Sequence, residues 1–425
     1  MKKIILVTVL IISLLRDARS QNYSVQMAET VLKTWTDSFS VIPGRKARWS
    51  YDQGVMLKGI EGIWKNTGDV KWFNYIQRMM DYYVREDGTI YDYRPDDYNI
   101  DHVNNGKLLL LLYRVTGKEK YRKAVELLRN QLRTHPRTNE GGFWHKKIYP
   151  WQMWLDGLYM GQPFYAEYAK LFHEDTTFND IANQFIYMER HARDPKTGLL
   201  YHGWDESRQQ RWANKETGLS PHFWGRALGW YGMAMVDVLD YFPDNHPGRD
   251  SIIGILNRFA KAVVKVQDKK SGVWYDIVDL PNRPKNYKEA SASSMLVYTL
   301  LKAVRKGYIP SFYLRNAKRG YDGIIREFVR IEDGQLNLHG TVSVSGLGGN
   351  PYRDGSFDYY MSEKVVVNDP KGVGAFLKAS VEMEMLPTLS VGKGKTVLLD
   401  RYFNSEKRKD ATGTPVYWHY VWEER

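Results

Sequence analysis

The chain has 425 residues, with 61 Lys and Arg against 49 Asp and Glu, for a formal net charge of +12. It contains no Cys, which excludes disulfides, thiolate metal sites, Cys nucleophiles and a lipoprotein anchor. Hydrophobic residues make up 43% of the chain and charged residues 26%, a composition that excludes general disorder and supplies a sizeable core.

The first twenty residues resemble a secretory signal. Lys2 and Lys3 precede the mostly apolar run Ile4–Leu15, which is too short to span a bilayer, and small residues at Ala18 and Ser20 suit signal peptidase. Removal of residues 1–20 would take away four basic groups and one acidic group, leaving a charge of +9. The sequence therefore predicts a periplasmic or secreted protein. Because no dense basic run and no second long apolar stretch follow, we expect neither nucleic acid nor membrane as a partner.

Helical periodicity dominates the chain as far as about residue 387. Apolar residues recur at i, i+3 and i+4, as in the stripe of Tyr121, Val125, Leu128 and Leu132. The pattern predicts twelve helices, over residues 24–40, 53–66, 69–84, 101–115, 118–133, 152–172, 176–192, 222–241, 249–268, 287–306, 311–330 and 370–385.

Two stretches of the chain repeat the same helix ending. Trp64 is followed by Thr67-Gly68 and Trp72, and Tyr113 by Thr116-Gly117 and Tyr121, with identical spacing. Gly after a helix and before the next one marks a tight hairpin. Repeated two-helix units of about 50 residues are typical of helical arrays. Six pairs predict an all-α fold closed into an (α/α)6 barrel, over residues 21–387.

Longer loops rich in Gly and aromatic residues separate the hairpins, and such loops commonly carry function. They cover residues 85–100, 134–151, 193–221, 269–286 and 331–369. Beyond residue 387, Lys395–Leu399 and Pro415–Trp422 read as short strands. We therefore expect a small C-terminal β-rich extension over residues 388–425, which could open a further domain.

Two lone carboxyls stand at predicted helix starts. Asp156 lies within the run Trp151–Met160, among apolar and aromatic residues, and Asp101 lies within Asn99–Gly106. Each could simply cap its helix. Alternatively, an apolar pocket would raise the pKa of Asp156, so that it stays protonated as a general acid. In a closed ring of hairpins, both helix starts would lie on the same rim.

Further candidates lie in the later motifs. His202 precedes Gly203-Trp204-Asp205, and Arg226 is flanked by Trp224 and Trp230. A buried Arg needs an anion, which could be a protein carboxylate or the acid group of a substrate. The Gly-rich segment 346–355 has no phosphate-binding spacing, and we interpret it as a rim loop closing over a ligand. No HExxH, tight His/Asp cluster or GxSxG occurs, so we expect no metal, no cofactor and no Ser nucleophile.

Several long strings resemble one enzyme family. WLDGLYMGQPFYAEYA, HGWDESRQQRW, FWGRALGWYGMAMVDVL, NYKEASASSMLVYTLLKAVRKGY and SVSGLGGNPYRDGSFDYY resemble the unsaturated rhamnogalacturonyl hydrolases of glycoside hydrolase family 105. The resemblance runs from about Tyr23 to Met385 and extends more distantly to unsaturated glucuronyl hydrolases. It implies an (α/α)6 barrel that removes the 4,5-unsaturated uronic acid left on oligosaccharides by polysaccharide lyases.

The resemblance also implies roles for individual residues. Asp156 would be the general acid/base, protonating C4 and activating water for attack at C5, and Asp101 would position the sugar. The remaining matched positions would contact substrate: Tyr51, His145, Trp154, His202, Trp224, Arg226 and Trp230. Repulsion from Asp101 would further raise the pKa of Asp156.

The polymer behind the substrate stays open at this stage. Pectic rhamnogalacturonan fragments are the first expectation, and ulvan or glycosaminoglycan fragments are the alternative. A sugar-binding barrel without catalytic activity is a second class of function that the aromatic loops would serve. The sequence says nothing about oligomeric state.

Overall fold

The computed structural model describes residues 22–36, 39–40 and 46–386, and its long helices overlap the twelve predicted ranges one for one. They are α2 (Tyr23–Thr34), α3 (Tyr51–Thr67), α4 (Val70–Asp81), α5 (Gly106–Thr116), α6 (Glu119–Thr134), α7 (Leu155–Leu171), α8 (Thr177–Ala192), α9 (Gly225–Val238), α10 (Pro247–Lys265), α11 (Ala290–Arg305), α12 (Leu314–Phe328) and α14 (Pro370–Met385).

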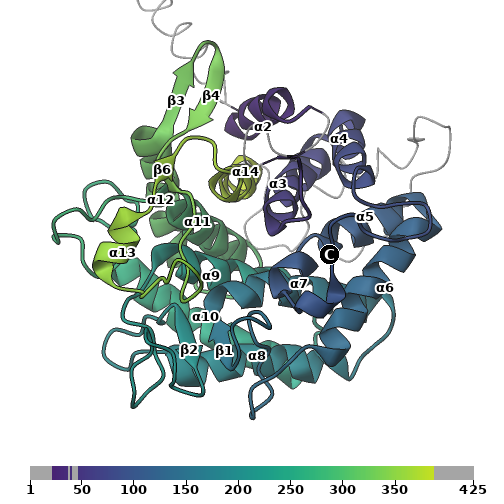
Figure 1. Cartoon of the computed structure of the whole chain (residues 1–425). Coiled ribbons are helices and arrows are strands. Elements are labelled where there is room, and N and C mark those ends of the chain that lie inside the picture. The colour runs from purple at the N-terminus through teal and green to yellow at the C-terminus, as the bar shows by residue number, and fades with distance from the viewer. Residues whose placement is uncertain (1–21, 37–38, 41–45, 387–425) are drawn as a thin grey trace, which may run out of the picture.

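These helices form two concentric layers. Helices α3, α5, α7, α9, α11 and α14 make an inner ring, which closes where α14 packs against α3 (Figure 1). The other six helices lie outside it. Every residue of α9 is buried, whereas α12 buries one face only. This difference is expected of a helix surrounded by others and of one that faces water. The predicted (α/α)6 barrel is therefore confirmed.

The repeated helix ending has the same geometry in both copies. Gly68 and Gly117 each end an inner helix at a φ of 66°, and their N–H groups donate to the carbonyls of Trp64 and Tyr113 at 2.7 and 2.8 Å. A positive φ costs Gly little, which explains its place there. These short turns join α3 to α4 and α5 to α6. They lie at the C-terminal ends of the inner helices, which we call the tight-turn end.

Long loops lead into the N-terminal ends of the inner helices, which we call the long-loop end. Three antiparallel strand pairs occur in or beside these loops. They are β1 (Gln152–Trp154) with β2 (Gly203–Asp205), β3 (Val329–Glu332) with β4 (Gln335–Leu338), and β5 (Thr341–Val342) with β6 (Val365–Val366). A short helix, α13 (Phe357–Ser362), and 3-10 turns at Pro95–Asp97, Ile100–Val103 and Ser311–Tyr313 complete the described elements.

The β3–β4 hairpin differs from the prediction, which extended a helix to residue 330 and continued as a loop. Asp333 and Gly334 form its turn with φ values of 50° and 71°, the conformation for which Asp-Gly is suited. Leu336 and Leu338 point into the core, while Gln335 and Asn337 do not. The alternation is only four residues long, which is why the helical pattern before it dominated.

The expected signal over residues 1–20 and the expected strands of the extension 388–425 lie outside the described residues. Within the described ranges, none of the helices has the length and apolar character needed to cross a membrane.

Candidate active site

The candidate residues near Asp156 are tied together by backbone hydrogen bonds at the long-loop end. The N–H of Ile100 donates to the carbonyl of His145 at 3.2 Å, and the N–H of His145 donates to that of Gln152 at 2.7 Å. The N–H of Leu155 donates to the carbonyl of His202 at 3.0 Å. Pairing of β1 with β2 adds a second link between the starts of α7 and the His202 segment. Loops distant in sequence are therefore fixed around the start of α7.

Asp156 is the second residue of α7 and does not cap it, since Trp154 is the N-cap residue and makes no side-chain cap bond. Its Oδ2 lies 3.2 Å from Nε2 of His202. The Asp156 side chain is 13% exposed although Oδ2 itself is buried, so the exposure lies on its other atoms. A carboxyl held this way can exchange a proton with a ligand and still face an imidazole.

His202 is held from its other side by Tyr360, a residue that the sequence analysis did not single out. The Tyr360 hydroxyl and Nδ1 of His202 are 2.8 Å apart, and both side chains are fully buried. Engagement of Nδ1 leaves Nε2 to face Asp156. Because the two residues are 158 positions apart, no local pattern could have joined them.

Several buried polar atoms at this site have no hydrogen bond to the described part of the protein. They include Nδ1 of His145, Oδ2 of Asp156 and Nε2 of His202. Buried polar groups in native proteins are almost always satisfied, so such a group calls for an explanation. Oδ2 of Asp156 and Nε2 of His202 face each other at 3.2 Å, whereas a polar ligand such as a sugar would provide a hydrogen bond to Nδ1 of His145.

Asp101 lies in a 3-10 turn ahead of α5, and Asn99 caps that turn. Its carboxylate is 2.6 Å from Nζ of Lys146 and 3.5 Å from Nε2 of His145. Burial raises the pKa of Asp101, but the charge of Lys146, helped by His145, outweighs burial and holds it below its usual range. Lys146 thus offsets the charge of Asp101, which weakens the repulsion that we expected it to exert on Asp156.

His145 is neutral near pH 7. Burial lowers its pKa to about 4, and the attraction of Asp101 opposes this only in part. Its ring stacks on Trp154 with the centroids 4.2 Å apart, and Tyr149 stacks on the same indole at 5.0 Å. Trp154 therefore forms an aromatic surface between the two histidines, because His202 meets it edge-on at 5.5 Å.

The Gly-rich segment 346–355 packs over this aromatic surface. Arg353 donates from Nη2 to the Tyr149 hydroxyl at 2.8 Å, and Leu347 is buried in one cluster with Trp154 and Trp212. The segment therefore lies at the rim, as expected. Closure over a ligand stays a prediction.

Arg226 has the first of the two partners expected from the sequence, a protein carboxylate. Its side chain is 1% exposed, with Nη2 3.5 Å from Oε1 of Glu289 and Nε donating to Oγ of Ser291 at 2.7 Å. The backbone carbonyls of Val342 and Ser343 accept its remaining hydrogen bonds. Four contacts thus engage the five N–H groups of the guanidinium within the protein, and its contact with a substrate stays a prediction.

The other predicted aromatic residues lie at different depths. Trp224 lies 4.7 Å from His202 between ring centroids, beside the site. Trp230 is 1% exposed and stacks on Tyr159 at 4.9 Å, while Tyr51, half-buried at the start of α3, meets Trp230 edge-on. Tyr51 and Trp230 therefore contact each other inside the ring.

Asp276 is a second residue that the sequence analysis missed. It is fully buried, Trp224 Nε1 donates to its Oδ1 at 3.0 Å, and its Oδ2 has no hydrogen-bond partner among the described residues. Burial, and then the charge of Glu289, raise its pKa to about 8. The available signal was a lone Asp among apolar residues in Val273–Val278, the same signal that pointed to Asp156.

The profile of Glycosyl Hydrolase Family 88 matches residues 23–387, so the chain belongs to that family and is a glycoside hydrolase. Over the described residues, no group of three or more His, Asp and Glu is placed to hold a metal ion.

Known proteins agree with this assignment. The solved structure of a family 105 glycoside hydrolase from C. acetobutylicum is 51% identical in sequence to this chain. It covers 86% of this chain and 100% of its own, with a TM-score of 0.83. The unsaturated rhamnogalacturonyl hydrolase YesR of Bacillus subtilis is 31% identical over 60% of this chain and 70% of its own length. The unsaturated glucuronyl hydrolase of Bacillus sp. GL1 is 14% identical with a TM-score of 0.64, over 85% of this chain and 95% of that one, and shows the shared fold. The protein is thus an enzyme of the unsaturated uronyl hydrolase group.

Proposed function

We propose that this enzyme removes the terminal 4,5-unsaturated uronic acid from lyase-generated oligosaccharides, and that its substrates are pectic rhamnogalacturonan fragments. The single observation that carries the reaction is the buried pair of Asp156 Oδ2 and His202 Nε2, 3.2 Å apart and without hydrogen bonds of their own in the described residues. The substrate class draws on the likeness to YesR, which is named for that activity.

The proposed reaction begins with proton transfer from Asp156 to C4 of the vinyl ether. The resulting oxocarbenium character at C5 is quenched by water, whose proton returns to the Asp156 carboxylate. The C5 hemiketal then opens as its C5–O5 bond breaks, and the hemiacetal left at C1 collapses to an aldehyde and releases the shortened oligosaccharide. One water is consumed, and Asp156 ends protonated, ready for the next cycle.

His202 and Tyr360 support both protonation states of Asp156. With the Tyr360 hydroxyl donating to Nδ1, the Nε2–H of His202 faces the carboxylate form. With the other tautomer, Nδ1–H donates to the hydroxyl, and Nε2 faces a protonated carboxyl. The imidazole can therefore match either form without gaining a charge, which suits a group that gives and regains one proton.

The ionised Asp101 completes the proposed site, because a carboxylate accepts hydrogen bonds from the hydroxyls of a sugar. Asp101 stays ionised because Lys146 lowers its pKa against burial, so it is an acceptor and not a second acid.

Water labelled with heavy oxygen tests the reaction. Hydration places the label at C5 of the released keto acid, whereas ordinary glycoside hydrolysis places it at the anomeric carbon. Label at the anomeric carbon would contradict the proposed mechanism.

A panel of lyase-generated disaccharides tests the substrate class. We expect ultraviolet absorbance of the double bond to disappear fastest with rhamnogalacturonan disaccharides. Faster loss with ulvan or glycosaminoglycan disaccharides would replace the pectic assignment and leave the reaction in place.

A further inference from the structure

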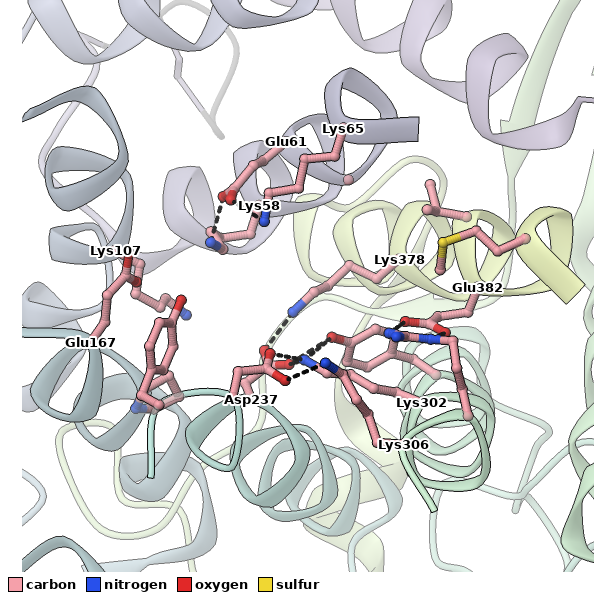
Figure 2. A pocket seen from close by; sticks show the side chains of 18 residues that line it. Lys58, Glu61, Lys65, Lys107, Glu167, Asp237, Lys302, Lys306, Lys378 and Glu382 are labelled. Atoms are coloured by element: carbon pink, nitrogen blue, oxygen red, sulfur yellow. Dashed lines mark hydrogen bonds and ion pairs between the residues drawn. The ribbon is translucent and has the colours of Figure 1, made fainter. Parts of the chain in front are cut away.

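A second cavity lies inside the ring, toward the tight-turn end. Its walls come from all six inner helices, and it holds about 920 Å³ of space, including the part open to solvent (Figure 2). Lys58, Glu61 and Lys65 line it from the second half of α3, and Lys302 and Glu382 from the last turns of α11 and α14. Trp154, Asp156 and His202 do not line it, so it is separate from the proposed active site.

Charged side chains dominate the cavity walls, and nearly all of them are paired. Asp237 lies 2.8 Å from Nζ of Lys302 and 2.6 Å from Nζ of Lys378. Asp240 lies 2.6 Å from Nζ of Lys302. Figure 2 shows this group on one side of the cavity and Lys107 with Glu167 on another.

Two more acidic groups of the wall are paired as well. Glu61 contacts Lys58 and Lys65, the latter at 3.1 Å. Glu382 lies 2.6 Å from Arg305. The fifth acid, Glu167, lies 3.8 Å from Arg114, and the wall carries seven basic residues against five acidic ones.

Lys107 differs from the other basic residues of the wall. It is 2% exposed, and its Nζ is buried without a hydrogen-bond partner in the described part of the protein. The Nζ lies 3.9 Å above the ring of Tyr159, whose hydroxyl is 3.5 Å from Nζ of Lys378. Burial, and then the charge of Lys378, lower the pKa of Lys107, while Asp237 and Glu167 oppose this from a distance. An unpaired buried amine is costly and implies a missing partner.

We propose that this cavity binds a small oxyanion, a carboxylate, sulfate or phosphate, and that Lys107 is its principal partner. The chemical class of the ligand follows from the groups of the cavity wall that have no partner. The acids already hold cations, so a further cation would find no free carboxylate among the paired groups, and the charged walls disfavour an apolar guest. An oxyanion would form a charge-assisted hydrogen bond with Lys107 and use the excess positive charge of the wall.

Isothermal titration calorimetry on the full chain tests the proposal, with sodium phosphate, sodium sulfate and sodium glucuronate as probes at constant ionic strength. We expect saturable binding of at least one probe. The variant Lys107→Met should weaken it at least about tenfold, as the loss of one charge-assisted hydrogen bond predicts. Loss of glucuronate binding in this variant points to an organic acid as ligand. Loss of phosphate or sulfate binding alone points to an inorganic one.

A matched control separates a built site from general attraction. Lys306→Met removes the same charge from the same wall, but this lysine lies 3.7 Å from Asp240, and we expect its effect to stay below about threefold. Lys107→Gln serves as a second variant if Lys107→Met does not fold. Both Lys107 variants should leave turnover unchanged. Absence of saturable binding to wild type, or equal weakening by the Lys107 and Lys306 variants, would overturn the proposal.

Discussion

Buried charges at the two ends of the barrel have different partners. At the tight-turn end, Asp237 lies within hydrogen-bond distance of two lysines, and Lys107 is a basic residue of the cavity wall whose Nζ has no hydrogen bond in the described residues. At the long-loop end, Asp156 and His145 each leave a buried polar atom without a hydrogen bond in the described residues. The helices supply charges whose spacing lets them pair with one another. The loops instead bring polar side chains from distant segments together around the start of α7.

The pKa values of two buried aspartates express this contrast. Lys302 and Lys378 outweigh burial and hold the pKa of Asp237 far below its usual range. Asp276 has Glu289 nearby, and burial raises its pKa to about 8. The same side chain is therefore ionised at one end and carries a proton at neutral pH at the other. The neighbouring charges decide between the two outcomes.

Removal of the Asp237 charge should have the largest effect on stability. Asp237→Asn leaves two buried lysines without their shared carboxylate, and breaking a buried pair costs about 3–5 kcal/mol. Chemical denaturation at pH 7 measures the free energy of unfolding. Asp322→Asn, on the exposed face of α12, is the control and should change it by less than about 0.5 kcal/mol. Equal stability of the two variants would contradict the importance of this pairing.

Asp276 should make the folded protein less stable as the pH rises. Its folded-state pKa is about 8 against an ordinary value of 3.8, so between these limits the folded state binds the proton more tightly than the unfolded chain. Stability contributed by this proton is present at low pH and is lost as pH rises toward 8, by up to about 1.4 kcal/mol per pH unit. Unfolding curves from pH 5 to 8 should show a flatter slope for Asp276→Asn. If the slope of the unfolding free energy against pH is the same in Asp276→Asn as in wild type, Asp276 does not carry this proton.

Tyr360 is a positioning residue for His202, and its removal should reduce turnover more than substrate binding. Tyr360→Phe deletes the hydroxyl 2.8 Å from Nδ1 of His202, and we expect kcat to fall about tenfold with little change in KM. Tyr321→Phe is the matched control, because it deletes a buried hydroxyl that bonds Ser380 at 3.0 Å between α12 and α14. Equal kcat in both variants would show that Tyr360 has only a structural role.

The smallest expected effect is on the pH profile. Lys146→Met removes the cation that lowers the pKa of Asp101. Burial raises that pKa, and in the variant the charge of Lys146 no longer opposes this effect. Asp101 would protonate at higher pH, so the acidic limb of the kcat/KM profile should move to higher pH. Lys147→Met, an exposed neighbour, should leave the profile unchanged. An unmoved limb for Lys146→Met would remove Asp101 from the ionised residues that activity requires.

The helical fold was predictable because it repeats a local pattern. The stripe from Tyr121 to Leu132 and the glycines at 68 and 117 are readable within about three turns of helix. The β3–β4 hairpin was missed, although its Asp333-Gly334 turn is a local signal, because four residues of alternation followed a strong helical stripe.

The site was predictable only in part, since its contacts join distant segments. Asp156 stands out as a lone acid among aromatic residues, and the resemblance to a known family supplied its proposed role. Tyr360, Lys146 and Asp276 act through partners that the loops bring together, and a single sequence holds no record of those pairings. The partner of Arg226 was left open for the same reason, and the structure places Glu289 there.

The central claim is that Asp156 at the long-loop end gives and regains the proton at C4. The most direct test is turnover of a lyase-generated rhamnogalacturonan disaccharide, followed by loss of its ultraviolet absorbance, for wild type and Asp156→Asn. We predict a fall of at least about 10²-fold in kcat, the scale expected for a lost general acid, with unchanged unfolding temperature. Near wild-type turnover in the folded variant would contradict the account.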